Sequence, residues 1–234
     1  MGNIQPSALS LSGVVKSFGK NNEKRALSGI DLAFADGEIT SITGPSGAGK
    51  STLLQIAGLM LTPDQGEVMV RERRVSEMTG ATRGRYLRQE LGFVFQRPAL
   101  IPEFTVLENV LLTDRILNGK VEASNLPYAK KLILEAGLSG CEAEFPWALS
   151  ETQQKTVTLV RALVNMPSIL LIDEPVAGMD ERSAEVMIRL IWQIHEKFRT
   201  TCIMVNNERV LAERSDRVIE LREGRVFADF RRGL

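Results

Sequence analysis

Residues 44–51 form a glycine-rich run whose spacing suits the binding of phosphate. The run matches G-x-x-x-x-G-K-S/T, follows an apolar segment and opens an apolar helical one. Its glycines let successive backbone N–H groups curl around phosphate oxygens, and a helix that begins there adds positive potential. The lysine can reach the β- and γ-phosphates of a nucleotide, and the serine hydroxyl can ligate Mg²⁺. The candidate nucleotide-binding residues here are Gly44, Pro45, Ser46, Gly47, Ala48, Gly49, Lys50, Ser51 and Thr52.

An acidic pair, Asp173 and Glu174, follows the apolar run 168–172. Such a run is typical of a strand buried on both faces, and open parallel sheets bind ligands at the carboxyl ends of their strands. Asp173 would then hold Mg²⁺ through its water shell, and Glu174 could act as general base toward an attacking water. Alone, an acidic pair after a strand is more often a helix-capping turn. Downstream of the phosphate-binding run, the catalytic interpretation is favoured.

The rest of the pattern predicts the elements that must position these groups. Alternating or short apolar runs predict strands at 7–15, 30–34, 38–43, 67–70, 92–95, 168–172, 201–205 and 216–221, the last leading into a hairpin through residues 223–224. Helical spacing predicts helices at 50–59, 83–90, 105–112, 127–136, 151–164 and 182–198. The chain is β-rich at its start, helical in its middle and βαβ-like at its end, which indicates an α/β fold.

Composition narrows the class of protein further. The chain has 234 residues, with 29 Lys or Arg against 29 Asp or Glu, so it lacks the basic excess usual in nucleic-acid binders. Its two cysteines, Cys141 and Cys202, stand far apart and imply neither a disulfide framework nor a zinc site. No apolar run approaches the ~20 residues that span a bilayer. The single histidine, His195, leaves little scope for a His-activated nucleophile or a multi-His metal site.

The order of these features resembles that of the ATP-binding-cassette (ABC) ATPases. Residues 93–96 (Phe-Val-Phe-Gln) look like the family's Q-loop, which would place Gln96 toward Mg²⁺ and the attacking water. Residues 149–153 (Leu-Ser-Glu-Thr-Gln) occupy the place of the signature L-S-G-G-Q, and residues 178–180 (Gly-Met-Asp) resemble the D-loop. Phe18 falls where the family puts an aromatic ring under the adenine, although such a residue alone would more often belong to the core. The resemblance implies ATP and Mg²⁺ as ligands.

The resemblance also implies an architecture. A single ABC ATPase domain over 1–234 would combine a P-loop NTPase core, RecA-like with an antiparallel β subdomain, and an inserted α-helical subdomain. The core would comprise about 1–95 and 150–234, and the helical subdomain about 96–149.

A subgroup within the family can be recognised as well. Residues 91–96 and 101–110 look most like the lipoprotein-releasing, macrolide-export and cell-division type. Members of this type are ATPases on the cytoplasmic face of the inner membrane, where they drive an integral-membrane permease. By this likeness, the helical subdomain would dock the permease. The chain would also pair with a second ATP-binding subunit, identical to it or different.

The signature departs from the family pattern. Ser150 is retained, and its hydroxyl could meet the partner's γ-phosphate across the dimer. Glu151 and Thr152 replace the two glycines, which removes the option of close backbone approach and adds a charge that repels a polyanion. This substitution favours weakened ATP-dependent closure of the dimer. The alternative is harmless drift with Glu151 pointing into water, since Glu is favourable in a first helical turn.

The switch position departs as well. After the strand 201–205 the family has a histidine that contacts the γ-phosphate, and here the residue is Asn207. Its amide could donate one hydrogen bond but is shorter and cannot titrate. His195 lies on the predicted helix 182–198, where an ordinary helix-face role is favoured. With Glu174 retained, the sequence predicts an ATPase whose hydrolysis is slow or dependent on a partner.

Two other functions remain open from the sequence. One is a catalytically weakened ATP-sensing or structural subunit, which the signature and Asn207 favour and Glu174 opposes. The other is a DNA-repair or chromosome-type ABC ATPase. Those families carry long coiled-coil or zinc insertions, whereas the interval 52–148 is short and lacks heptads and paired cysteines. The zero net charge also weighs against a nucleic-acid partner.

Overall fold

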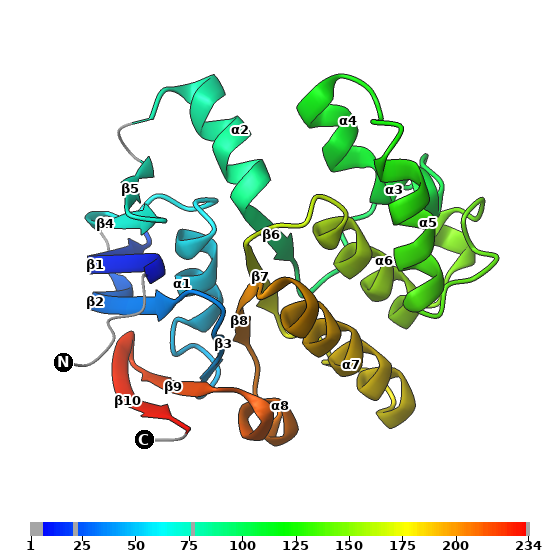
Figure 1. Ribbon diagram of the computed structural model, residues 1–234. Helices are drawn as coiled ribbons and strands as arrows, with labels where there is room; N and C mark the ends of the chain where they lie inside the picture. Colours follow the sequence, from blue (N-terminus) through cyan, green and yellow to red (C-terminus); the bar gives the residue numbers. More distant parts are fainter. Residues whose placement is uncertain (1–6, 21–22, 76–77, 233–234) are drawn as a thin grey trace.

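The computed structural model describes residues 7–20, 23–75 and 78–232, so the predicted domain over 1–234 includes four short segments outside the described residues. Two sheets organise the chain (Figure 1). The first is antiparallel, in the order β2-β1-β4-β5. Its strands are β1 (Ser7–Phe18), β2 (Lys24–Ala35), β4 (Gln65–Val70) and β5 (Arg73–Arg74).

The second sheet has six strands in the order β10-β9-β3-β8-β7-β6 and is parallel except where β10 pairs with β9. The parallel neighbours are far apart in the sequence, as crossover connections require, whereas β9 and β10 form a hairpin. Its strands are β3 (Ile39–Thr43), β6 (Leu91–Val94), β7 (Ile169–Asp173), β8 (Thr201–Val205), β9 (Arg217–Arg222) and β10 (Arg225–Arg231).

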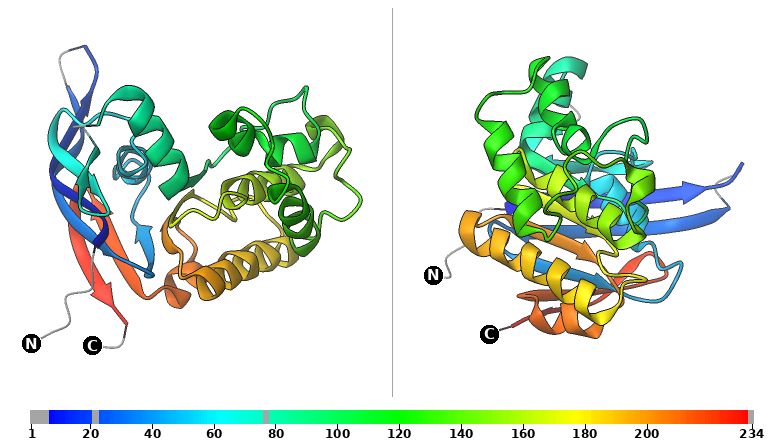
Figure 2. Two further views of the ribbon diagram at one scale, coloured as in Figure 1. Left: turned by 45° about the horizontal axis from the view of Figure 1, so that its top comes forward. Right: turned by 90° about the vertical axis from the view of Figure 1, so that its right-hand side faces the viewer.

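Helices cover both faces of the six-stranded sheet. On one face α1 lies between the two sheets, while helices of the middle of the chain and α7 cover the other (Figures 1 and 2). The helices are α1 (Lys50–Ala57), α2 (Gly80–Glu90), α3 (Val106–Val110), α4 (Leu112–Asn118), α5 (Asn125–Glu135), α6 (Glu151–Leu163), α7 (Glu181–Phe198) and α8 (Arg209–Arg214), with a 3₁₀ turn at Pro146–Ala148.

Strand β7 shows why the sequence folds this way. All five of its residues are buried, and successive side chains point to opposite faces. Ile169 and Leu171 join the apolar core around α1, whereas Leu170 and Ile172 join the core under α6 and α7. An uninterrupted apolar run is therefore needed here rather than an alternating one. The predicted strand buried on both faces is confirmed.

Three of the differences between the predicted and the observed elements have a clear physical reason. Residues 105–112 form not one helix but parts of α3 and α4, which meet at Leu111. Strand β2 begins at Lys24, six residues before the predicted start, because residues 24–29 pair with β1 although Leu27 is the only buried residue among them. Helix α8 was not predicted, since a single buried residue, Leu211, holds it against the core. Local patterns miss elements that tertiary pairing stabilises.

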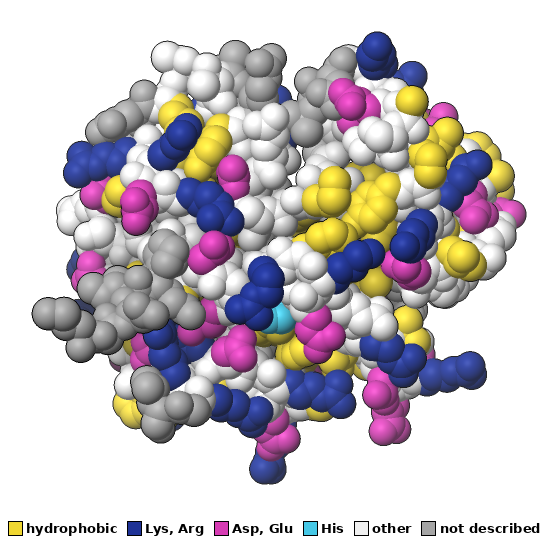
Figure 3. Space-filling view, in the orientation of Figure 1, with side chains coloured by type: hydrophobic (Ala, Val, Ile, Leu, Met, Phe, Trp, Pro, Cys, Tyr) yellow, Lys and Arg dark blue, Asp and Glu magenta, His cyan; other side chains and the backbone are white. Residues whose placement is uncertain are grey.

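The surface is mixed in charge. On the face shown in Figure 3, basic and acidic side chains are interspersed, and apolar side chains gather over the helical part of the molecule. Within the described ranges, no helix has the length and hydropathy that a bilayer crossing requires.

The junction between β3 and the helix that follows generates the first prediction. Gly44 has φ +139°, and a Cβ built there would lie 2.1 Å from the carbonyl oxygen of Leu221 on β9. We expect Gly44→Ala to lower the free energy of unfolding by about 3 kcal/mol or more, because backbone strain and overlap with a fixed backbone atom add. Urea denaturation measures this change.

Gly140→Ala is the matched control. Gly140 also has positive φ (+83°), but nothing lies within 4 Å of an added Cβ. Its substitution should cost only about 1 kcal/mol. Equal losses in the two variants would show that close packing against β9 is not what requires the glycine.

Candidate nucleotide-binding site

The phosphate-binding run forms the turn between β3 and α1. Gly49 caps α1 with φ 99°, so the turn enters the helix through a left-handed residue. The Lys50 ammonium is buried and donates to the carbonyl oxygens of Gly44 at 2.6 Å and Pro45 at 3.1 Å. It therefore lies inside the curve of the turn, beside the positive end of the helix. This is the geometry of an anion-binding loop.

Ser51 and Asp173 meet although 122 residues separate them. The Ser51 hydroxyl donates to Asp173 Oδ1 at 3.2 Å, and Asp173 is the last residue of β7. Burial raises the pKa of Asp173; the adjacent Glu174 acts in the same direction, while the Ser51 hydrogen bond and Lys50 oppose it. A hydroxyl and a carboxylate at this spacing are the hard oxygen donors that suit Mg²⁺.

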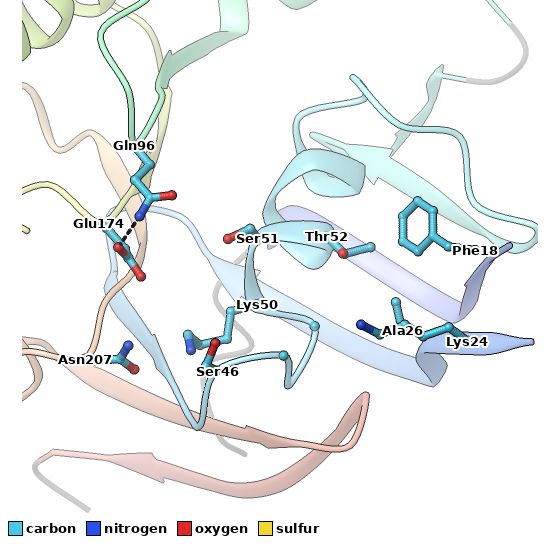
Figure 4. Close-up of a pocket in the computed structure, with 12 residues that line it drawn as sticks. Phe18, Lys24, Ala26, Ser46, Lys50, Ser51, Thr52, Gln96, Glu174 and Asn207 are labelled. Carbon is cyan, nitrogen blue, oxygen red and sulfur yellow. Dashed lines mark hydrogen bonds between the residues drawn. The ribbon is translucent and has the colours of Figure 1, made fainter.

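Glu174 and Gln96 form a second pair at the same edge of the sheet. Gln96 Nε2 donates to Glu174 Oε2 at 2.6 Å, and in Figure 4 the Gln96 oxygen points toward Ser51. Glu174 has φ 48°, and its N–H donates to the Val205 carbonyl at 2.8 Å. A non-glycine residue held in this region is strained, and the adjacent strand β8 fixes it there. Because its Nε2 donates to Glu174 Oε2, the Gln96 amide orients the carboxylate.

Lys50, Ser51, Gln96 and Glu174 line one elongated cavity of about 470 Å³ (Figure 4), and Asp173 is joined to it through Ser51. Phe18 lies at one end, and Glu174, Gln96 and Asn207 lie at the other, with the glycine-rich turn between them. A nucleotide with its base at Phe18 would direct its terminal phosphate toward Glu174. The lining residues are Phe18, Lys24, Ala26, Ser46, Gly47, Gly49, Lys50, Ser51, Thr52, Gln96, Glu174 and Asn207.

The two residues before Phe18 on β1 hold this aromatic residue in place. Phe18 is 42% exposed, which suits a stacking surface better than a core position. Asp64 accepts from Lys16 Nζ and from the Ser17 N–H, each at 2.7 Å, and these bonds hold the Asp64 pKa below its usual range. The Lys16 ammonium also lies 5.8 Å from the Phe18 ring centroid. The aromatic platform is thereby anchored to the turn that precedes β4.

Lys24 and Ala26 line the cavity without having been predicted. Lys24 pairs with Phe18 across the β1–β2 hairpin. No local pattern marks either residue, because only the register of the hairpin brings them beside the ring. They are residues that sequence reasoning missed.

The two asparagines after β8 lie in different surroundings. Asn206 is buried and donates to the Ser41 hydroxyl at 3.0 Å, which ties β8 to β3. Asn207 is exposed and lines the cavity, as the switch position should. His195 is buried at the end of α7, where Nδ1 lies 2.9 Å from the Thr200 carbonyl oxygen. His195 does not line this cavity and so does not supply the imidazole that position 207 lacks.

The altered signature lies outside this cavity. Ser150 caps α6: its hydroxyl accepts from the Gln153 N–H at 3.2 Å, and its own N–H donates to Gln153 Oε1 at 2.9 Å. The Glu151 side chain is 79% exposed and lies 3.6 Å from Lys155 Nζ. Glu151 thus points outward, as the alternative interpretation of this residue proposed. Weakened dimer closure stays a prediction.

Together, a glycine-rich turn between a parallel strand and a helix, a hydroxyl–carboxylate pair and a strand-end glutamate define a P-loop NTPase. The profile of the ABC transporter family matches residues 27–177. The lipoprotein-releasing system ATP-binding protein LolD of Xanthomonas euvesicatoria is 40% identical over 198 residues, which cover 85% of this chain and 81% of that protein. LolD of Bacteroides fragilis is 36% identical, covering 93% of this chain and 99% of that protein.

Solved structures agree with these sequence relatives. The dimeric structure of MJ0796, a bacterial ABC transporter cassette, has a TM-score of 0.90 and 32% identity, and covers 97% of this chain and 100% of that one. A second dimeric structure of MJ0796, in a post-hydrolysis state bound to ADP and Pi, has a TM-score of 0.89. This chain belongs to the ABC transporter family. The fold class and the subgroup expected from residues 91–96 and 101–110 are confirmed.

The buried carboxylate of Asp173 generates the second prediction. Its raised pKa means that the folded protein binds a proton there more tightly than the unfolded chain, so its contribution to stability falls as pH rises through that pKa. At pH 7 we expect Asp173→Asn to raise the melting temperature of the nucleotide-free protein by about 2–4 °C. Differential scanning calorimetry measures this shift.

The gain should shrink in acid, where the wild-type carboxyl is also neutral. The same variant should lose the Mg²⁺-dependent part of its ATP affinity, which titration with and without EDTA reveals. A lower melting temperature at pH 7 would contradict the inferred cost of burying this group.

Proposed function

We propose that this chain is the ATPase subunit of a membrane transporter of the lipoprotein-releasing type. One observation carries the proposal: the Gln96–Glu174 pair lines the same cavity as Lys50 and Ser51, and Ser51 is hydrogen-bonded to Asp173. This arrangement provides an anion site, a Mg²⁺ site and a general base within one cavity. The names of the relatives support the type of transporter.

Each group has a distinct task in hydrolysis. The Lys50 ammonium leaves its own loop carbonyls to neutralise the β- and γ-phosphates. Ser51 and Asp173, with Gln96 beside them, would hold Mg²⁺, which neutralises charge that develops on the phosphate oxygens. Glu174 accepts a proton from the attacking water, and Gln96 holds that carboxylate in place. Phe18 stacks on the adenine at the far end of the cavity.

The proposed assembly follows from the same likeness. The chain would form a dimer in which Ser150 of one subunit meets the γ-phosphate bound by the other, and a homodimer and a heterodimer are both consistent with this arrangement. The dimeric cassettes among the solved structures support such a pairing. We further propose that residues 96–149 dock an integral-membrane permease, which holds the subunit at the cytoplasmic face of the inner membrane. Residues 1–95 and 150–234 would form the nucleotide-binding core of the single domain.

The rate of turnover is proposed to be low or dependent on a partner. Asn207 presents a short, non-titrating amide where an imidazole would reach the γ-phosphate. The same feature favours a second candidate function, an ATP-sensing subunit that binds nucleotide with little turnover. The retained Glu174–Gln96 pair opposes that candidate, because such a subunit needs no general base.

The third prediction tests the general base. In the complex with its permease, Glu174→Gln should lower kcat by at least about 100-fold while ATP affinity stays within about twofold, since Gln cannot accept the proton but fills the same space. Steady-state phosphate release measures turnover. Glu185→Gln on the exposed face of α7 is the control. Unchanged turnover in Glu174→Gln would eliminate the catalytic proposal and leave the ATP-sensing one.

The fourth prediction concerns the switch position. Asn207→His should raise kcat by about threefold or more, because a longer donor reaches the charge that develops in the transition state. The gain should disappear when Glu174→Gln is present as well. Asn207→Ala serves as the comparison variant. Equal turnover with asparagine, histidine or alanine at position 207 would show that this position does not limit the reaction.

A further inference from the structure

Lys155 is a buried lysine outside the nucleotide cavity. It lies one helical turn after Glu151 on α6, and its Nζ donates to the carbonyl oxygen of Ala177. Glu151 Oε1 lies 3.6 Å away and, in the described part of the chain, is the only acidic oxygen within 4 Å of this ammonium. A buried ammonium needs such partners, because desolvation without them is costly.

Ala177 belongs to the turn that follows the candidate general base. Its N–H donates to the Glu174 carbonyl oxygen at 3.3 Å, and the Met179 N–H donates to that of Val176 at 3.1 Å. These bonds join Glu174, in its left-handed conformation, to the residues that resemble the D-loop. The Lys155 ammonium holds this turn from the side of α6.

The start of α6 is itself firmly held. Ser150 and Gln153 form a capping box, and Gln154 Nε2 donates to the carbonyl oxygens of Pro146 at 2.9 Å and Leu149 at 3.2 Å. The signature and the residues before it therefore form one unit with the first turns of the helix. Lys155 connects that unit to the turn after Glu174, so the two cannot shift independently without breaking a buried hydrogen bond.

We infer that Lys155 is a positioning residue that fixes the turn after Glu174 to the signature end of α6, with Glu151 as its counterion. The inference rests on the proposed function, in which Glu174 is the general base and Ser150 meets the partner's nucleotide. It assigns a role to the glutamate that replaces a signature glycine. Glu151 supports turnover by neutralising Lys155, and repulsion of the partner's phosphate is not its main effect.

The test compares Lys155→Met, Lys155→Arg and Glu151→Gln in the full chain with its permease. Lys155→Met should lower kcat about tenfold with KM for ATP within twofold, because Lys155 does not line the nucleotide cavity. Lys155→Arg should restore kcat to within about threefold of wild type, since a guanidinium can donate to the same carbonyl. Glu151→Gln should lower kcat about twofold, and should have no effect in the Lys155→Met background.

Lys197→Met is the matched control, because Lys197 is an exposed lysine in the last turn of α7, outside both the nucleotide cavity and residues 96–149. If Lys155 had only a structural role, ATP affinity and melting temperature would fall together with kcat in Lys155→Met, and Lys155→Arg would not restore turnover. That result would overturn the inference. A rise in kcat in Glu151→Gln would overturn it too, in favour of phosphate repulsion. If Glu174→Gln retains full turnover, the proposed function itself fails; if only Lys155→Met retains it, the inference alone fails.

Discussion

The parallel pairing of β7 with β8, and of β8 with β3, determines where the functional groups of this protein meet. Because the three strands run in the same direction, their carboxyl ends meet at one edge, as in other open α/β sheets. That edge brings the Lys50 turn, Asp173 and Asn207 together from segments more than 120 residues apart in places. The two apolar cores on either side hold the strands rigid, since each buried strand serves both.

This rigidity allows the site to hold its groups in unfavourable states. Asp173 stays buried with a raised pKa, and Glu174 keeps a left-handed backbone. Lys50 is satisfied by carbonyl oxygens of its own loop. In the proposed function, each group serves a nucleotide and its cation rather than maximal stability, which is the usual compromise at functional sites.

The altered signature has a different meaning in the fold than in the sequence. From the sequence alone, Glu151 places a negative charge where the family's glycine lets the backbone approach a phosphate closely. In three dimensions its side chain extends into solvent beside Lys155, and that lysine bonds to the turn after Glu174. Asn206 and Asn207 show a similar contrast, because Asn206 forms a buried hydrogen bond to Ser41 whereas Asn207 lines the cavity. Side-chain direction, which spacing alone does not give, separates these roles.

The phosphate loop, the acidic pair, the family and most strands and helices follow from the order of the residues alone. Continuous apolar runs such as 168–172 and the spacing of residues 44–51 are local patterns with one physical solution each. Other features arise only when the chain folds: Lys24 and Ala26 join Phe18, residues 105–112 divide between two helices, and Lys155 reaches Ala177. Those features depend on strand register and on packing between distant segments. A local sequence pattern describes only one of the two segments that form such a contact, so it does not predict the contact.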